Sequence, residues 1–160
     1  MRKTENARKA LPDRNSIETA VRSFCLDHDE IDFVLLFGSF HNGSPHRMSD
    51  IDLALHVSGD MPLIRQGMFV SELEERLHLT VDLCILNGLF RKDPGFAFAV
   101  IKESVPLFVR DREAFIIFKK NVFLYYMDTE RLRKANLDGV KYRIKNRILG
   151  VSDAGKNHQA

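Results

Sequence analysis

The chain contains few of the features that mark secreted or membrane-bound proteins. Its 160 residues include only two cysteines, and no apolar run approaches the roughly 18 residues that a membrane span needs. Cys25 and Cys84 stand alone in apolar segments, which predicts buried free thiols in a reducing cytosol rather than a disulfide or a cysteine metal site. The basic residues 1–3 are followed by polar residues instead of an apolar signal core. We therefore expect a cytoplasmic protein without a membrane segment.

Internal repeats and low-complexity segments are also absent, and opposite charges nearly balance at a net charge of +2. Apolar residues make up 44% of the chain and charged residues 29%, which is typical of a globular protein. The length suits one domain with one sizeable core. We expect a single domain over residues 1–150, in which residues 1–14 form a loose arm, and a flexible tail over residues 151–160.

The most informative segment joins two apolar runs that are typical of strands. The first run, over residues 31–37, ends at Gly38-Ser39, and ten residues later the second begins around Asp50-Ile51-Asp52. Glycine lets the backbone approach a phosphate closely or adopt a positive φ. A short helix that begins at Ser39 would offer free N–H groups and a hydroxyl to a phosphate. The Gly-Ser pair therefore predicts a phosphate-binding turn.

Three aspartates in this region suit the binding of divalent metal. Strand side chains alternate between faces, so Asp50 and Asp52 are expected to point the same way. Two such carboxylates can hold a pair of Mg²⁺ ions about 3.5–4 Å apart. Asp82, in a third strand-like run over residues 79–86, looks buried and could complete the site or accept the proton of an attacking hydroxyl. The apolar neighbours of Asp52 predict that its charge needs a cation or metal.

Each part of this pattern has a simpler interpretation when it is taken alone. Two acids at a strand end usually face solvent, and a Gly-Ser pair usually marks a turn. The combination favours binding of a nucleoside triphosphate with divalent metal and transfer of a nucleotide. Ser49 would either bind a phosphate or cap the strand entry, and His41 and His46 would either contact nucleotide or face solvent.

The remaining pattern predicts a small α/β (α+β) fold, with helices packed on a mixed sheet of about four strands. The expected strands cover residues 31–37, 51–56, 79–86 and 105–109. The expected helices are one opened by a capping box of Asn15 and Glu18, one that buries Phe69, Leu73 and Leu77, a short one over residues 96–102, and a long one from about Asp111. Residues 87–88 and 93–95 are expected to form turns or loops.

The motif of Gly38-Ser39 followed by Asp50-x-Asp52 resembles the signature of the polymerase-β-type nucleotidyltransferase superfamily. It is most similar to the minimal, or MNT, branch, whose members are encoded as antitoxins beside HEPN-domain toxins. The similarity continues through residues 81–87 and residues 101–128, and covers roughly residues 17–130. At residues 40–43 the chain departs from the commoner pattern, which has a small and a basic residue before Gly43.

The resemblance implies a polymerase-β-type fold with a long C-terminal helix, and a Mg²⁺-dependent reaction with ATP as nucleotide donor. It implies that AMP is transferred to a hydroxyl, expected to be a tyrosine, of a cognate HEPN ribonuclease, which is thereby neutralised. The implied catalytic and metal-binding residues, with two Mg²⁺ ions, are Asp50, Asp52 and Asp82. The implied nucleotide-binding residues are Gly38, Ser39 and Ser49.

Two other functions stay open. A small-molecule nucleotidyltransferase, for example one that modifies an antibiotic, should need a second domain to bind its acceptor, and a single domain has no room for one. A non-catalytic antitoxin would act by binding alone. For a single-domain nucleotidyltransferase, we expect either a partner protein or a homodimer to supply the surface that binds the acceptor. The basic residues between 131 and 147 form either a solvated helix face or a docking surface, and without interleaved aromatic residues we expect a protein partner rather than direct nucleic-acid binding.

Overall fold

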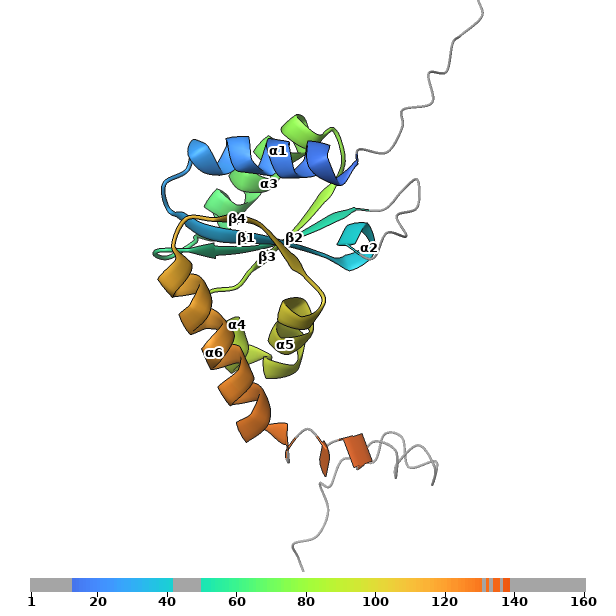
Figure 1. Ribbon diagram of the computed structural model, residues 1–160, viewed down its shortest axis with the longest axis vertical. Coiled ribbons are helices and arrows are strands. Elements are labelled where there is room, and N and C mark those ends of the chain that lie inside the picture. The colour runs from blue at the N-terminus through green and yellow to red at the C-terminus, as the bar shows by residue number, and fades with distance from the viewer. Residues whose placement is uncertain (1–12, 42–49, 131, 133, 136, 139–160) are drawn as a thin grey trace, which may run out of the picture.

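The computed structural model describes residues 13–41, 50–130, 132, 134, 135, 137 and 138 (Figure 1). Its centre is a four-stranded sheet in the order β3-β2-β1-β4. The strands are β1 (Ile31–Phe37), β2 (Ile51–Val57), β3 (Val81–Ile85) and β4 (Val105–Val109). The helices are α1 (Arg14–Leu26), α2 (Gly38–His41), α3 (Leu63–Leu77), α4 (Leu89–Lys92), α5 (Pro94–Lys102) and α6 (Arg112–Asp128). The predicted mixed sheet with a long late helix is confirmed.

Strand β1 is central and runs antiparallel to both β2 and β4, whereas β2 and β3 are parallel. Helix α3 supplies the crossover that a parallel pair requires. Phe33 and Leu35 of β1 face one core cluster, and Val34 and Leu36 face the other. This burial on both faces explains why residues 33–37 of β1 form a continuous apolar run in the sequence.

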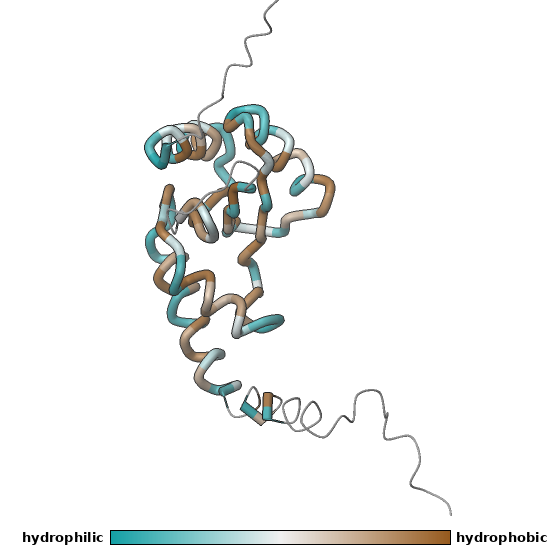
Figure 2. The backbone as a smooth tube through the Cα atoms, turned by 90° about the vertical axis from the view of Figure 1, so that its right-hand side faces the viewer, coloured by the Kyte–Doolittle hydropathy of each residue, from teal (hydrophilic) through white to brown (hydrophobic). Residues whose placement is uncertain are grey.

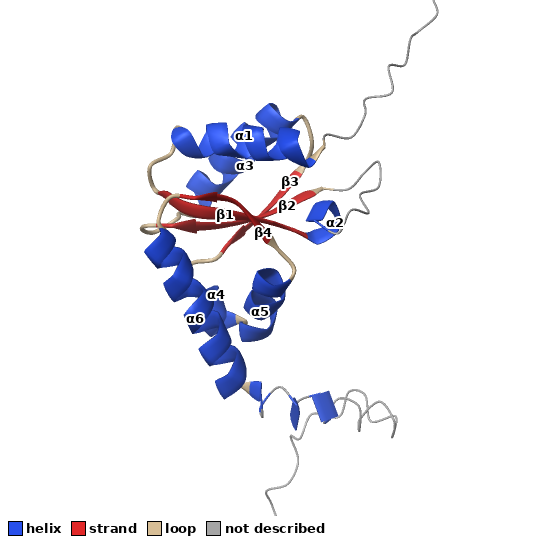
Figure 3. Ribbon diagram, in the orientation of Figure 1, coloured by secondary structure: helices blue, strands red, loops and turns tan. Residues whose placement is uncertain are grey.

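Helices cover both faces of the sheet (Figure 3). On one face α1 and α3 enclose the larger core cluster, in which the rings of Phe24 and Phe69 meet edge to face at 5.0 Å. On the other face α4, α5 and α6 enclose a second cluster that includes Phe33 and Phe118. Hydrophobic and hydrophilic positions alternate along the helices (Figure 2), as expected for helices with one buried face. No helix in the described part of the chain has both the length and the apolar character to cross a membrane.

Helix α1 begins earlier than the sequence analysis predicted. The carboxylate of Asp13 caps it by accepting the Ser16 N–H at 2.9 Å, and Arg14 is already helical. The predicted capping box of Asn15 and Glu18 is therefore wrong. Glu18 instead pairs with Arg22 one turn later, at 3.0 Å. Asp13 stands just before the helix and accepts a first-turn N–H that has no partner within the helix, whereas Asn15 already lies inside the first turn.

Residues 89–92, for which the sequence predicted no element, form the short helix α4. Its Phe90 is buried against α6, where its ring centroid lies 6.0 Å from Phe118 and 5.0 Å from Tyr125. Just before it, the side-chain amide of Asn87 donates to the Val57 carbonyl and accepts the Val57 N–H, at 2.8 and 3.1 Å. These two hydrogen bonds extend the pairing of the sheet beyond the end of β3. Cys25 is buried as expected, whereas Cys84 is only half-buried.

Several predicted features fall outside the described residues. They are the arm apart from residues 13 and 14, Ser49 and His46, residues 131, 133, 136 and 139–147 of the basic segment, and the tail over residues 151–160. A single domain over residues 1–150 stays a prediction.

Candidate active site

The predicted motif residues that the structure describes lie where β1 leads into α2 and near the starts of β2 and β3. Figure 1 shows where β1 leads into α2. Asp52 is in register with Phe37 on β1 and with Asp82 on β3. Ala54 and Cys84, two residues further along their strands, both pack in the cluster beneath α4, α5 and α6. Because strand side chains alternate, Asp52 and Asp82 face that same side. Parallel pairing thus brings two carboxylates together from neighbouring strands.

Gly38 is shaped by its contact with Asp52. Its φ is +70°, and a Cβ placed on it would lie 1.9 Å from Oδ2 of Asp52. Both the left-handed backbone and the close approach therefore require glycine. The next residue, Ser39, donates its backbone N–H to the Asp52 carboxylate. The predicted positive φ is thus confirmed, and the close approach that the structure describes is to an aspartate.

The electrostatic environment of Asp52 is unfavourable for its charge. Burial raises the pKa of Asp52, the Asp82 carboxylate raises it further, the Ser39 N–H bond opposes this, and Asp50 adds a smaller increase. None of the ion pairs between described residues involves any of these three aspartates. The site therefore concentrates negative charge that a cation would stabilise.

Asp50 and Asp82 are placed differently from Asp52. Asp50 lies one residue before β2 and is exposed, and its Oδ1 accepts a hydrogen bond from the Thr80 hydroxyl. Asp82 is also exposed, so the expectation that it is buried is wrong. Its strand, β3, forms the edge of the sheet, and the local sequence does not reveal that position. Sequence reasoning also missed Thr80, whose only signal was its position two residues before Asp82.

The donor set suits a hard cation. All three candidate side chains are carboxylates, which Mg²⁺ prefers together with water and substrate phosphate. Among the described residues, no three His, Cys, Asp or Glu side chains form a preassembled metal site. Burial raises the pKa of Asp52, and the neighbouring carboxylates of Asp82 and Asp50 raise it further, as expected where acids gather without a cation. The residues therefore fit Mg²⁺ that completes its coordination with water and phosphate oxygens.

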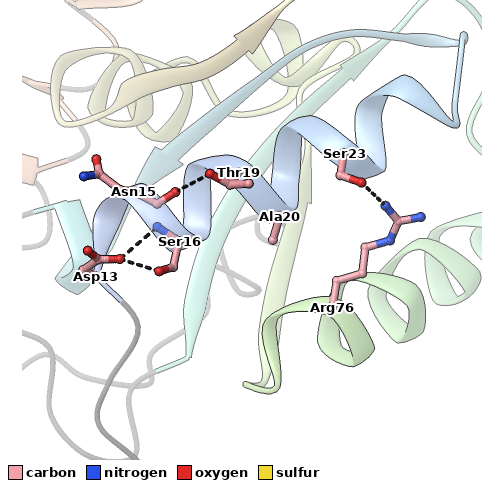
Figure 4. Close-up of a pocket in the computed structure, with 7 residues that line it drawn as sticks. All are labelled: Asp13, Asn15, Ser16, Thr19, Ala20, Ser23 and Arg76. Atoms are coloured by element: carbon pink, nitrogen blue, oxygen red, sulfur yellow. Dashed lines mark hydrogen bonds between the residues drawn. The ribbon is translucent and has the colours of Figure 1, made fainter.

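A concave surface along α1 is a weaker candidate for a ligand-binding site. A cavity of about 640 Å³ opens along α1 (Figure 4), on the opposite face of the sheet from Asp52. Its polar groups already bond to one another: Asp13 to Ser16, the Asn15 carbonyl to Thr19, and Ser23 to Arg76 at 3.1 Å. They leave no convergent donor set for a ligand.

Comparisons with known proteins identify the family of the chain. A sequence model of the family described as polymerase beta, nucleotidyltransferase matches residues 19–113. A search of curated proteins finds no significant match.

Among solved structures, a toxin–antitoxin with AMP-PNP is 23% identical, with a TM-score of 0.69 over 78% of this chain and 98% of that one. A tri-AMPylated Shewanella oneidensis HEPN toxin in complex with MNT antitoxin is 20% identical, with a TM-score of 0.65 over 79% of this chain and 98% of that one. An MntA-HepT toxin–antitoxin is 19% identical, with a TM-score of 0.65 over 80% and 99%.

At these identities the solved structures show a shared fold. The family match extends over more than half of the chain and contains both the Gly38-Ser39 turn and the three aspartates. The chain therefore belongs to the polymerase beta nucleotidyltransferase family and is a nucleotidyltransferase.

Proposed function

We propose that the chain is a Mg²⁺-dependent protein adenylyltransferase of the MNT antitoxin type, which transfers AMP from ATP to a hydroxyl of a HEPN toxin. The observation that carries this proposal is the gathering of Asp52 and Asp82 beside the Gly38-Ser39 turn, with Asp50 next to them. The fold is shared with a toxin–antitoxin that contains AMP-PNP and with a complex that contains an AMPylated HEPN toxin. A cytoplasmic location stays a prediction.

The aspartates would divide the chemistry between them. Asp50 and Asp52 would hold the metal, and Asp82 would either complete the metal site or act as the base. Bound Mg²⁺ would neutralise charge on the triphosphate and favour ionisation of the attacking hydroxyl. The acceptor oxygen forms a bond to the α-phosphorus as the bond to pyrophosphate breaks. Asp82 is the candidate to accept the proton of the acceptor, because it is exposed where a second molecule can reach it.

Gly38 and Ser39 would hold the triphosphate beside these carboxylates, together with Ser49 in the undescribed segment. Ser39 is half-buried in the first turn of α2, and its N–H already points at Asp52. A phosphate bound there would lie within reach of any metal held by Asp52. Gly38 and Ser39 would therefore act by positioning the α-phosphate for in-line attack, in addition to the proton transfer proposed for Asp82.

The acceptor hydroxyl would come from another molecule. The described residues form one sheet with two helical layers and include no separate layer that could hold an acceptor. A HEPN-type toxin protein is the proposed acceptor, in a hetero-oligomer, and a homo-oligomer is the other arrangement that would supply a second surface. A tyrosine is the proposed acceptor side chain.

The proposal is tested by co-expressing the chain with the product of its neighbouring gene and measuring the intact mass of both proteins. We expect the partner to co-purify and to gain whole AMP units. The matched control carries Asp50→Asn with Asp52→Asn and should bind the partner without adding mass. Neutralisation of the partner by wild-type and control alike, without added mass, would favour a binding antitoxin. Efficient modification of a free small alcohol or aminoglycoside instead would favour a small-molecule transferase.

A further inference from the structure

We infer that Thr80 is a positioning residue for Asp50: its hydroxyl holds one carboxylate oxygen so that the other faces the metal. The inference rests on the proposed role of Asp50 as a metal ligand. Thr80 donates to Oδ1 of Asp50. A carboxylate has a second oxygen with free lone pairs, so this bond leaves Oδ2 available for Mg²⁺. Thr80 itself does not need to touch metal or nucleotide.

Asp50 needs such a partner because the fold does not otherwise fix its side chain. It lies before the first paired residue of β2 and is exposed to solvent. Within the described part of the chain, the Thr80 hydroxyl is the one hydrogen-bond partner recorded for its carboxylate. An exposed aspartate without a partner samples several rotamers, and ordering it on metal binding costs free energy.

Thr80, in contrast, is held firmly by the backbone. Its carbonyl accepts the Ile51 N–H at 2.9 Å, which ties it to the residue next to Asp50. Two hydrogen bonds to Glu74 hold the turn between α3 and Thr80. The Glu74 carbonyl accepts the His78 N–H at 2.8 Å, and its side chain accepts the Val81 N–H at 3.1 Å. His78 itself adopts a left-handed conformation, with a φ of 57°, at the end of α3. The Thr80 hydroxyl is therefore presented from a fixed point.

Two of the aspartates are thus oriented by different contacts: Asp52 lies between Gly38 and the Ser39 N–H, and Asp50 depends on Thr80. Strand pairing fixes the backbone of Asp82. Partners that orient metal ligands typically contribute 10–100-fold to metal affinity. Loss of the Thr80 hydroxyl should therefore act on metal binding more than on folding.

The experiment compares Thr80→Val, which keeps the shape but removes the hydroxyl, with Thr80→Ser, which keeps the hydroxyl. Mn²⁺ binding to the full chain with a non-hydrolysable ATP analogue is measured by electron paramagnetic resonance. We expect Thr80→Val to weaken Mn²⁺ binding by roughly 10-fold or more and Thr80→Ser to restore it to within a few fold. Because Thr80 is exposed, both variants should unfold at nearly the wild-type temperature.

The matched control is Thr19→Val on α1, which removes a hydroxyl that donates to the Asn15 carbonyl at 2.9 Å. It should leave Mn²⁺ affinity unchanged. Equal affinity in Thr80→Val and wild type overturns the inference, and so does a Thr80→Ser variant that binds as weakly as Thr80→Val. If wild type itself binds no Mn²⁺, the metal site fails with it. If metal binding behaves as expected but no partner gains AMP, only the proposed acceptor is wrong.

Discussion

The two ends of the sheet treat acidic side chains in opposite ways. At the end where β1 begins, acids are paired with basic side chains: Asp32 with His56 at 2.8 Å, Glu30 with Arg65 at 2.6 Å and Asp29 with Arg110 at 2.6 Å. At the end where β1 finishes, Asp50, Asp52 and Asp82 gather without a described cation. The acids of the first end are paired within the chain, whereas we propose that a bound cation compensates those of the second end.

The contrast is sharpest between Asp32 and Asp52. Asp32 is 7% exposed, and its carboxylate meets Nδ1 of His56, whose ring stacks on Phe33 with centroids 4.8 Å apart. Asp52 is half-buried and has no basic partner among the described residues; burial raises its pKa, and the Asp82 carboxylate raises it further. Burial alone therefore does not mark a functional acid. An acid whose buried charge lacks a partner does.

The largest change should follow removal of the unpaired charges. Asp50→Asn with Asp52→Asn should reduce nucleotide transfer to the background of the assay, because the carboxylates proposed to hold metal are gone. Stability should stay level or rise, because the repulsion among the three acids is relieved. Transfer assays and thermal unfolding of the same preparation measure both. Wild-type transfer rates in the double variant would contradict the assignment of the site.

The next largest effect should come from Gly38→Ala. The new Cβ would lie 1.9 Å from Oδ2 of Asp52, so the carboxylate must move away from its present position. We expect nucleotide transfer to fall steeply and ATP binding, measured by calorimetry with Mg²⁺, to weaken.

Gly88→Ala is the matched control, because Gly88 has the same φ of +70° but no atom within 4 Å of an added Cβ. Both variants lose roughly 1–2 kcal/mol of stability from the left-handed backbone. Only Gly38→Ala should lose activity. Equal activity in the two variants would show that the contact with Asp52 is unimportant.

At the paired end of the sheet the expected effect is on stability alone. Asp32→Ala leaves His56 without its partner between Phe33 and Phe118, which should cost about 1–3 kcal/mol of the free energy of unfolding. Nucleotide transfer per folded molecule should stay at the wild-type rate. Urea unfolding and transfer assays below the transition separate the two quantities. A proportionate loss of activity would mean that the two ends are coupled.

Local pattern predicted much of this structure. The bounds of β1 and β4 were predicted as they stand, and so was the turn at Gly38, because a buried strand and a glycine turn each depend on a few consecutive residues. The exposure of Asp82 could not be predicted in this way, since it follows from the strand order, which places β3 at an edge. The bond from Thr80 to Asp50 joins residues 30 positions apart and leaves no local trace.

The smallest expected effect is a pH dependence that belongs to Asp52. Its folded pKa lies above its ordinary value of 3.8, so the folded chain binds a proton that the unfolded chain has released. Asp52 therefore contributes stability below pH 3.8 that is lost as the pH rises through the folded pKa. Asparagine does not ionise, so the Asp52→Asn variant does not lose this stability as the pH rises. In urea unfolding without metal, its stability advantage over wild type should be small in acid, grow as the pH rises, and then stay constant. Adding Mg²⁺ and ATP should stabilise only the wild type and so reverse the order of the two proteins. An advantage for Asp52→Asn that does not vary with pH would mean that the charge of Asp52 is already compensated, and that the two ends of the sheet are more alike than their side chains indicate.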